Sequence, residues 1–228
     1  MSTGYINRTK PTTGYAGNRL VSATVAALLV IGAILLSALP AFAGTNGLLN
    51  SNQTGSSDIT AFTKWTSVLP RYEQQRAAAN DQCIGTGCLN QKWEKLLTEL
   101  ADKPVNEQIS GVNNFFNAMK YISDQKNYGV NDYWNSPYEL MERGGDCEDY
   151  AIAKYISLKR LGVEESDMRI LIVKDESLGG ELHAILEVKQ PEAVVILDNQ
   201  SKKALPVARV THYDPIYAIN ESKWWAYR

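Results

Sequence analysis

The sequence has few of the residues that most often carry chemistry. Its 228 residues include only three cysteines and two histidines, so each of these can be weighed individually. A basic excess is also absent, because 23 Lys and Arg residues are balanced by 25 Asp and Glu residues and the formal charge is -2. This balance argues against a protein that binds nucleic acid by neutralising phosphates. Hydrophobic residues make up 44% of the chain, which is enough for an ordinary globular core.

A long, nearly unbroken apolar run extends from Val21 to Leu39. Three basic residues and no acid precede it, and the small residues Ala41 and Ala43 follow it. This pattern predicts a signal peptide over residues 1–43 that is cleaved after Ala43, and hence an exported protein. The alternative is an uncleaved membrane anchor, since about 19 apolar residues can span a bilayer. The helix-breaking Pro40 favours cleavage.

Export makes the three cysteines informative. Cys83 and Cys88 enclose a short flexible loop, and we expect them to form a disulfide in an oxidising compartment, with two unpaired surface thiols as the alternative. Cys147 is then left over. An unpaired cysteine in an exported protein indicates a reactive thiol, although a lone cysteine is more often a small buried hydrophobic residue.

The exported part divides into an arm and one domain. Residues 44–62 are rich in Gly, Ser, Asn and Thr and predict a flexible N-terminal arm, which leaves residues 63–228 as the domain. Helical patterns come first in this domain, and strand patterns follow over residues 168–173, 181–189 and 193–198. Helices followed by an antiparallel meander indicate an α+β fold, in which a central helix packs on the sheet.

The central helix is expected to begin at Asp146, which can cap it, and to end at Gly162. Cys147 then lies in its first turn. Exposed backbone N–H groups at this end of a helix stabilise a thiolate, and they can also receive the oxyanion that forms when a carbonyl is attacked. A thiol in this place suits covalent catalysis, provided that a base lies nearby.

His183 is the better of the two candidate bases. It lies in the second expected strand and Asp198 ends the third, and a hairpin turn centred on the bond before Pro191 makes these two residues face each other. Facing side chains have Cβ atoms roughly 4.5 to 5.5 Å apart, within reach of a carboxylate–imidazole hydrogen bond. No facing acid can be argued for His212, which we interpret as a surface or structural residue. We therefore expect a triad with Cys147 as the nucleophile.

Three acids flank the thiol and oppose this chemistry. A carboxylate about 5 Å from a thiolate raises its free energy by on the order of 3 kcal/mol and its pKa by roughly 2 units. Either Asp146, Glu148 and Asp149 point away as caps and solvated groups, or a hard cation neutralises them. Oxygen ligands clustered in one turn suit calcium, but the same spacing is also ordinary capping composition.

The residues around the thiol resemble a known family. The segment GGDCEDYA at residues 144–151, together with His183-Ala184 and Leu197-Asp198-Asn199, resembles the bacterial transglutaminase-like cysteine proteinases of the LapG type. The resemblance covers about residues 60–225 and is most specific between residues 146 and 162. It implies a papain-like fold in the transglutaminase sense, with Cys147, His183 and Asp198 as the catalytic triad.

The resemblance also implies biology that spacing does not reveal. Members of the family are periplasmic and calcium-dependent, which strengthens the expectation of calcium at Asp146, Glu148 and Asp149. They cleave large repeat-rich surface adhesins near the N-terminus and so promote biofilm dispersal, and an inner-membrane cyclic di-GMP receptor sequesters them. The alternatives are a transglutaminase or cell-wall amidase with the same triad, or a non-enzymatic, calcium-dependent adhesin-binding protein.

The expected reaction is acyl transfer through a thioester. Cys147 attacks a peptide carbonyl, His183 protonates the leaving amine, and water resolves the thioester. The backbone N–H of Cys147 is one expected donor to the oxyanion. The indole of Trp134 is a candidate for the second donor, and a position in the core is the alternative for this residue.

Overall fold

The computed structural model describes residues 53–79 and 82–228, which belong to one compact unit, Phe42–Arg228. The expected signal peptide over residues 1–43 lies outside the described residues and stays a prediction. Within the described ranges, no helix is both long enough and apolar enough to cross a membrane.

Six α-helices occupy the N-terminal part of the described chain. Helix α5 begins with a capping box, because Glu139 N–H donates to Ser136 Oγ (3.2 Å) and Ser136 N–H donates to Glu139 Oε2 (2.7 Å). Helix α6 begins at Cys147, as the capping residues before it predict. The helices are α1 (Thr63–Ala79), α2 (Leu89–Leu100), α3 (Val105–Asn117), α4 (Asp124–Asn127), α5 (Pro137–Arg143) and α6 (Cys147–Arg160).

A sheet of seven antiparallel strands completes the fold, in the spatial order β1-β7-β6-β2-β3-β4-β5. The expected meander is present as β2, β3 and β4, and the C-terminal segment adds β6 and β7 on the other side of β2. The α+β fold is confirmed. The strands are β1 (Gln53–Ser56), β2 (Met168–Asp175), β3 (Glu181–Lys189), β4 (Val194–Leu197), β5 (Leu205–Pro206), β6 (Tyr213–Ile219) and β7 (Trp224–Tyr227).

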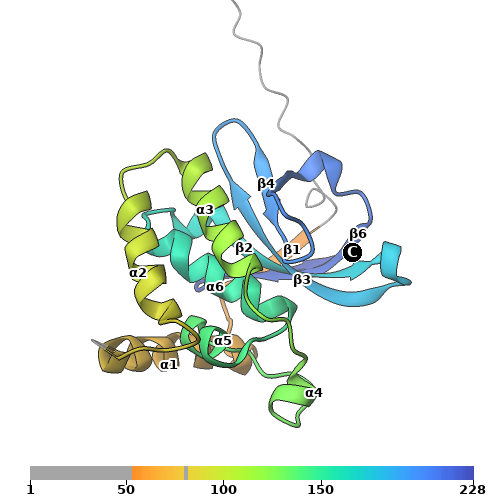
Figure 1. Ribbon diagram of the computed structural model, residues 1–228. Coiled ribbons are helices and arrows are strands. Elements are labelled where there is room, and N and C mark those ends of the chain that lie inside the picture. Colours follow the sequence, from red (N-terminus) through yellow and green to blue (C-terminus); the bar gives the residue numbers. More distant parts are fainter. Residues whose placement is uncertain (1–52, 80–81) are drawn as a thin grey trace, which may run out of the picture. The chain divides into compact units, whose positions relative to one another are not determined.

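Helix α6 is the centre of the fold (Figure 1). It packs on β3 and β2 on one side and on α3 and α5 on the other. Every residue from Asp149 to Leu158 is buried, which is why the sequence of this helix shows only a weak amphipathic stripe. A smaller apolar cluster that includes Leu171, Ile185 and Tyr213 is a second core separate from the helical one.

Residues 44–62 were expected to form a flexible arm, but the second half of this segment is attached to the domain. Residues Gln53–Ser56 form the edge strand β1, which pairs with β7. Beyond it, the ring of Phe62 lies 5.4 Å from the rings of both Tyr217 and Trp224. A few apolar anchors therefore attach a polar, Gly- and Ser-rich segment to the domain. Residues 44–52 lie outside the described residues.

The β3–β4 hairpin turns one residue later than expected. Lys189 pairs with Val194, and Gln190 N–H donates to Ala193 O at 2.8 Å, so the turn is centred after Pro191 and not before it. The expected turn centre is therefore wrong. The physical reason lies in Pro191, which has no N–H for strand pairing and whose fixed φ suits the first position of a turn.

Candidate active site

Backbone constraints just before α6 fix the position of Cys147. The chain enters α6 through Gly144, whose φ is +85°, and a Cβ there would lie 2.5 Å from Lys120 O. Gly145 then forms a parallel bridge with Tyr121, through hydrogen bonds from Ile122 N–H (2.9 Å) and to Lys120 O (3.2 Å). Because only glycine tolerates this entry, the pair at residues 144–145 places the half-buried thiol at the start of the helix.

His183 and Asp198 are joined by a hydrogen bond of 3.0 Å between Nε2 and Oδ1. They do not face each other directly, because Leu186 pairs with Leu197 and Asp198 therefore lies opposite Ile185. A turn centre displaced by one residue shifts the pairing by two, and a shift of two keeps each side chain on its face of the sheet. The expected contact is therefore diagonal, which is still within reach of an imidazole.

The Asp198 carboxylate is held by three donors. Besides His183, it accepts hydrogen bonds from Tyr213 Oη (2.6 Å) and from Gln200 N–H (2.8 Å). Burial raises the pKa of Asp198, but these hydrogen bonds outweigh burial and hold its pKa below the ordinary value. With Nε2 engaged by Asp198, Nδ1 is the nitrogen of His183 that remains for the thiol. Sequence reasoning missed Tyr213 and Gln200, since no local pattern links them to Asp198.

Cys147 and His183 line the same cleft, which has a volume of about 570 Å³. Trp134 lines it as well and is only 7% exposed, packed edge-on against Trp65 with ring centroids 6.4 Å apart. Trp134 is therefore a buried residue that also lines the cleft, and its role as an oxyanion donor stays a prediction. His212 is not among the lining residues of this cleft, and its ring packs 4.1 Å from that of Tyr213.

The electrostatic surroundings of the thiol oppose its ionisation. Burial raises the pKa of Cys147 far above its ordinary value, and the neighbouring Glu148 raises it further. The sulfur donates to Glu148 Oε2 at 3.3 Å. The pKa of Glu148 is itself raised, first by burial and then by Asp146 and Asp149. The concern raised by the sequence is therefore real, because Glu148 contacts the thiol of Cys147 and does not point away.

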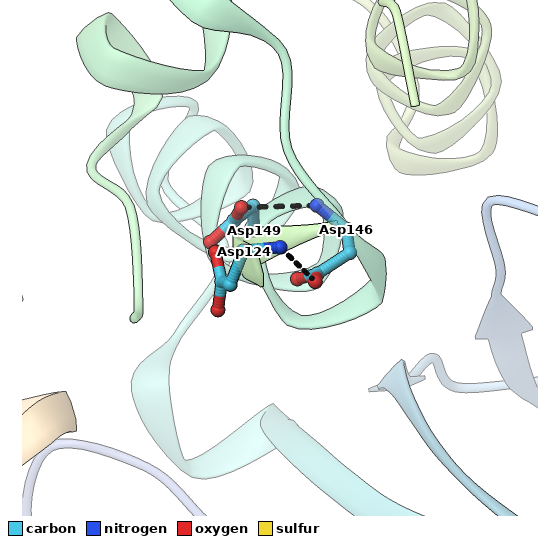
Figure 2. Close-up of side chains that lie close together, drawn as sticks. All are labelled: Asp124, Asp146 and Asp149. Atoms are coloured by element: carbon cyan, nitrogen blue, oxygen red, sulfur yellow. Dashed lines mark hydrogen bonds between the residues drawn. The ribbon is translucent and has the colours of Figure 1, made fainter. Parts of the chain in front are cut away.

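The three predicted calcium ligands do not form one cluster. Asp149 accepts hydrogen bonds from Asn135 N–H (2.7 Å), Asn135 Nδ2 (2.6 Å) and Asp146 N–H (3.1 Å), so it acts as a helix cap. It lies with Asp146 and Asp124 in one carboxylate group (Figure 2), while Glu148 belongs to a second group with Asp132 and the same Asp124.

Asp124 and Asp132 are the acids that sequence reasoning missed. Asp124 is 1% exposed at the start of α4, where an acid is normally read as a cap, and Asp132 lies in the loop that follows. Both precede the nucleophile by more than a dozen residues in the chain, so no spacing rule connects them to it. Tertiary folding alone brings them to α6.

Two carboxylate oxygens show that the acidic cluster suits a hard cation. Asp124 Oδ1 and Asp146 Oδ1 are buried and accept no hydrogen bond within the part of the chain that the structure describes. Burial raises the pKa of Asp124, and the charges of Asp146 and Asp132 add to this. An all-oxygen donor set with unsatisfied acceptors is the chemistry that calcium prefers.

The disulfide expected between the other two cysteines is confirmed. Cys83 and Cys88 are joined by a disulfide, with their Cα atoms 4.5 Å apart. Cys147 is thus the free cysteine among the residues described, and it is the one placed in the cleft.

A thiol at the start of a buried helix, with a His–Asp pair on the sheet it packs against, defines the papain-like class of cysteine hydrolases. The profile of the family described as bacterial transglutaminase-like cysteine proteinase BTLCP matches residues 80–226, more than half of the chain. The chain belongs to this family, and it is a cysteine protease.

Solved structures support the same assignment. Calcium-bound LapG from Legionella pneumophila is 32% identical, with a TM-score of 0.59 over 68% of this chain and 87% of that one. EGTA-treated LapG from the same organism is also 32% identical, with a TM-score of 0.58 over 68% and 84% of the two chains. A comparison with curated protein sequences gave no significant match.

Proposed function

We propose that this protease is an exported endopeptidase that uses Cys147 as nucleophile, His183 as base and Asp198 as the group that orients the imidazole. The observation that carries the proposal is the shared cleft of Cys147 and His183, with His183 bonded to a carboxylate at 3.0 Å. That bond fixes the ring and stabilises the imidazolium that forms when the thiol gives up its proton.

In this mechanism, the Cys147 thiolate attacks the carbonyl carbon of the scissile peptide bond. The backbone N–H of Cys147 at the helix start donates to the oxyanion, and the Trp134 indole is the proposed second donor. His183 then passes its proton to the leaving amine, which departs as a new N-terminus. Water attacks the thioester with His183 as base, and the acid product leaves while the thiol is restored.

For calcium, the proposed ligands are Asp124, Asp132, Asp146 and Glu148, with Asp149 capping the helix beside them. These residues fall in two groups that share Asp124. They fit because two of their buried oxygens lack a partner within the described residues and because the donors are all carboxylates. When bound, the ion supplies positive charge that compensates the carboxylates around the thiol. Without such compensation, Glu148 keeps the proton on Cys147.

The proposed substrate is a large repeat-rich surface adhesin, cleaved near its N-terminus so that cells leave a biofilm. We further propose a periplasmic location and sequestration by an inner-membrane cyclic di-GMP receptor. Membership of the family and the similarity to Legionella LapG support these proposals. The open cleft is compatible with an extended segment of a large protein, which a closed cavity would exclude.

The first prediction tests the nucleophile and the base. The mature protein is mixed with the N-terminal regions of the host's large adhesins, with and without calcium, and the products are mapped by mass spectrometry. We expect one calcium-dependent cut that Cys147→Ala and His183→Ala both abolish, with a loss of at least about 10³-fold. His212→Ala is the matched control, because it removes the other histidine without touching the cleft, and it should retain activity.

The outcomes separate the competing functions. Cleavage by either purified, folded cleft variant at the wild-type rate would contradict the proposal. Incorporation of an added amine into the acyl product would instead indicate a transglutaminase, since the thioester is then resolved by an amine. Release of peptides from cell-wall material would indicate an amidase, and calcium-dependent binding without turnover would indicate an adhesin-binding protein.

A further inference from the structure

Asp198 lies just beyond the end of its strand, where the sheet no longer holds its backbone. The pairing of β4 with β3 ends at Leu197, opposite Leu186, and its pairing with β5 ends at Ile196. Asp198 therefore begins the loop of residues 198–204, which connects β4 to β5. Hydrogen bonds hold its carboxylate, but the side chain can be aimed only as well as the backbone beneath it is placed. An element other than the sheet must fix this backbone.

Two asparagines of α3 supply that support. Asn117 Nδ2 donates to Asp198 O (2.9 Å) and to Ser201 O (2.8 Å). Asn113, one turn earlier in the helix, is 0% exposed, and its Nδ2 donates to Ser201 O at 3.5 Å. Within the described ranges, these are the hydrogen bonds that join the backbone of residues 198–204 to another element. The backbone of the loop is thus attached to the end of a helix.

The chemistry of this contact fixes the direction of the Asn117 amide. Both of its partners are carbonyl oxygens, so only Nδ2, with its two N–H donors, can face them. The Oδ1 atoms of Asn113 and Asn117 are buried and accept no hydrogen bond within the part of the chain that the structure describes. A buried acceptor without a partner destabilises a fold. An amide that is kept under this penalty indicates that its two donors are the useful part.

The same end of α3 also braces the helix of the proposed nucleophile. Helix α3 ends at Asn117, and the chain that follows forms the parallel bridge between Tyr121 and Gly145. Gly145 lies two residues before Cys147. The short segment of residues 117–121 therefore contacts both halves of the proposed site. Its side chain at 117 holds the loop of the orienting acid, and its backbone holds the entry to α6.

We propose that Asn117 is a positioning residue of the protease, whose two N–H donors set the place of the Asp198 carboxylate relative to His183 and Cys147. This inference rests on the proposed triad. Asn117 is not among the residues that line the cleft and belongs to neither carboxylate group, so it acts through Asp198. Reacting groups must be held closely, since a displacement of about 1 Å can lower a rate by about 10²-fold.

The test begins with Asn117→Leu, which removes both donors and the unsatisfied Oδ1 while keeping a branched side chain of similar size. For hydrolysis of the adhesin fragment at saturating calcium, kcat should fall by about tenfold or more. KM should change by less than about twofold, because the contact matters for the reaction and not for binding of the substrate. Asn114→Leu is the matched control. It makes the same change at an exposed position of the same helix and should leave both constants unchanged.

The second readout is the imidazole of His183, followed in the folded protein without substrate by NMR of the ring nitrogens and their protons. The chain has two histidines, so the spectrum contains two rings, and His183→Ala assigns them. In the wild type the proton should reside on Nε2, which lies 3.0 Å from Asp198 Oδ1. In Asn117→Leu this tautomer should lose population, and its proton should exchange faster with water. The ring of His212 should not change.

A merely structural role for Asn117 would lower the melting temperature without moving the His183 signals of the folded molecules. Wild-type kcat in Asn117→Leu would therefore overturn the proposal, and so would a reduced kcat with unchanged His183 signals, because the effect would not then pass through Asp198. If the leucine variant does not fold, Asn117→Ser is judged by the same two readouts. Its single short donor cannot reach both carbonyl groups.

The same measurements separate this inference from the proposed function. If Cys147→Ala still cleaves the fragment, or if the wild-type proton of His183 resides on Nδ1, the triad itself is wrong. If cleavage requires Cys147 and the proton resides on Nε2, but Asn117→Leu matches the wild type in both readouts, the triad stands and only the role of Asn117 is rejected.

Discussion

The two walls of the cleft differ in how well their polar groups are satisfied. On the sheet side, Asp198 accepts hydrogen bonds from His183, Tyr213 and Gln200, and its pKa is held low. On the helix side, Asp124 and Asp146 each keep a buried oxygen that has no partner among the residues the structure describes, and the pKa of the nearby thiol is raised. The hydrogen bonds around the proposed base are therefore supplied by the chain itself, whereas the proposed nucleophile lies beside acids that we propose a calcium ion to neutralise.

This contrast gives the two walls different sensitivities. Substitutions on the sheet wall, which comprises His183, Asp198 and the donors to Asp198, should reduce catalysis at any calcium concentration, because these hydrogen bonds are built into the fold. Substitutions on the helix wall, which comprises Cys147 and the acids around it, should reduce catalysis in a way that depends on calcium. The three predictions below examine this difference, in decreasing order of expected effect.

The largest effect is expected for Asp198→Asn. The amide cannot stabilise an imidazolium and turns its own N–H₂ toward a ring nitrogen that needs an acceptor, so kcat should fall by about 10³- to 10⁴-fold. Peptide hydrolysis at saturating calcium measures this loss. Added calcium should not restore the activity, and a recovery with calcium would contradict the separation of the two walls.

A smaller, conditional effect is expected for Asp124→Asn on the helix wall. The substitution removes one negative charge shared by both carboxylate groups, so calcium should bind at least about tenfold more weakly. Activity should fall at limiting calcium and recover at high calcium. Calcium should also raise the melting temperature of the wild type more than that of the variant.

Asp102→Asn is the control, because it removes an exposed acid that belongs to neither carboxylate group. Wild-type activity that survives complete removal of calcium, verified by metal analysis, would contradict the proposed role of the ion.

The smallest effect is expected for Tyr213→Phe. The change removes one hydrogen bond to a buried carboxylate, so it should lower kcat by about tenfold and stability by about 1 to 3 kcal/mol at neutral pH. Because the folded pKa of Asp198 lies below its unfolded value, the stabilisation is present above about pH 4 and is lost as pH falls through the folded pKa. Urea unfolding at several pH values should show the two proteins converging in acid. A difference that grows below pH 4 would have the wrong sign.

The parts of the site that local rules govern were predictable from the sequence. Asp146 as a cap predicts Cys147 at a helix start, and the structure has it there. The contact of His183 with Asp198 was found for a less secure reason. The expected turn is wrong by one residue, and the contact survives because strand alternation has a period of two.

The parts that depend on tertiary folding were not predictable. Asp124 and Asp132 reach α6 from a separate loop, and Tyr213 reaches Asp198 from β6, which lies beyond β2 and β3 in the sheet. No periodicity or spacing in the sequence predicts such contacts between distant segments. The edge strand at Gln53–Ser56 was missed for a related reason, since its polar composition hides the pairing partner at the far end of the chain.

The parallel bridge between Tyr121 and Gly145 has a consequence for engineering this protease. One short stretch of chain, residues 120–124, pairs with the residues that lead into α6. The same stretch ends in Asp124, which belongs to both carboxylate groups proposed to bind calcium. A graft of α6 alone into another scaffold would carry the thiol of Cys147. It would lack both the bridge that positions the start of the helix and the full set of acids proposed to bind calcium. The smallest portable unit of this catalytic machinery is therefore the continuous block of residues 120–160, moved together with a sheet that presents the histidine.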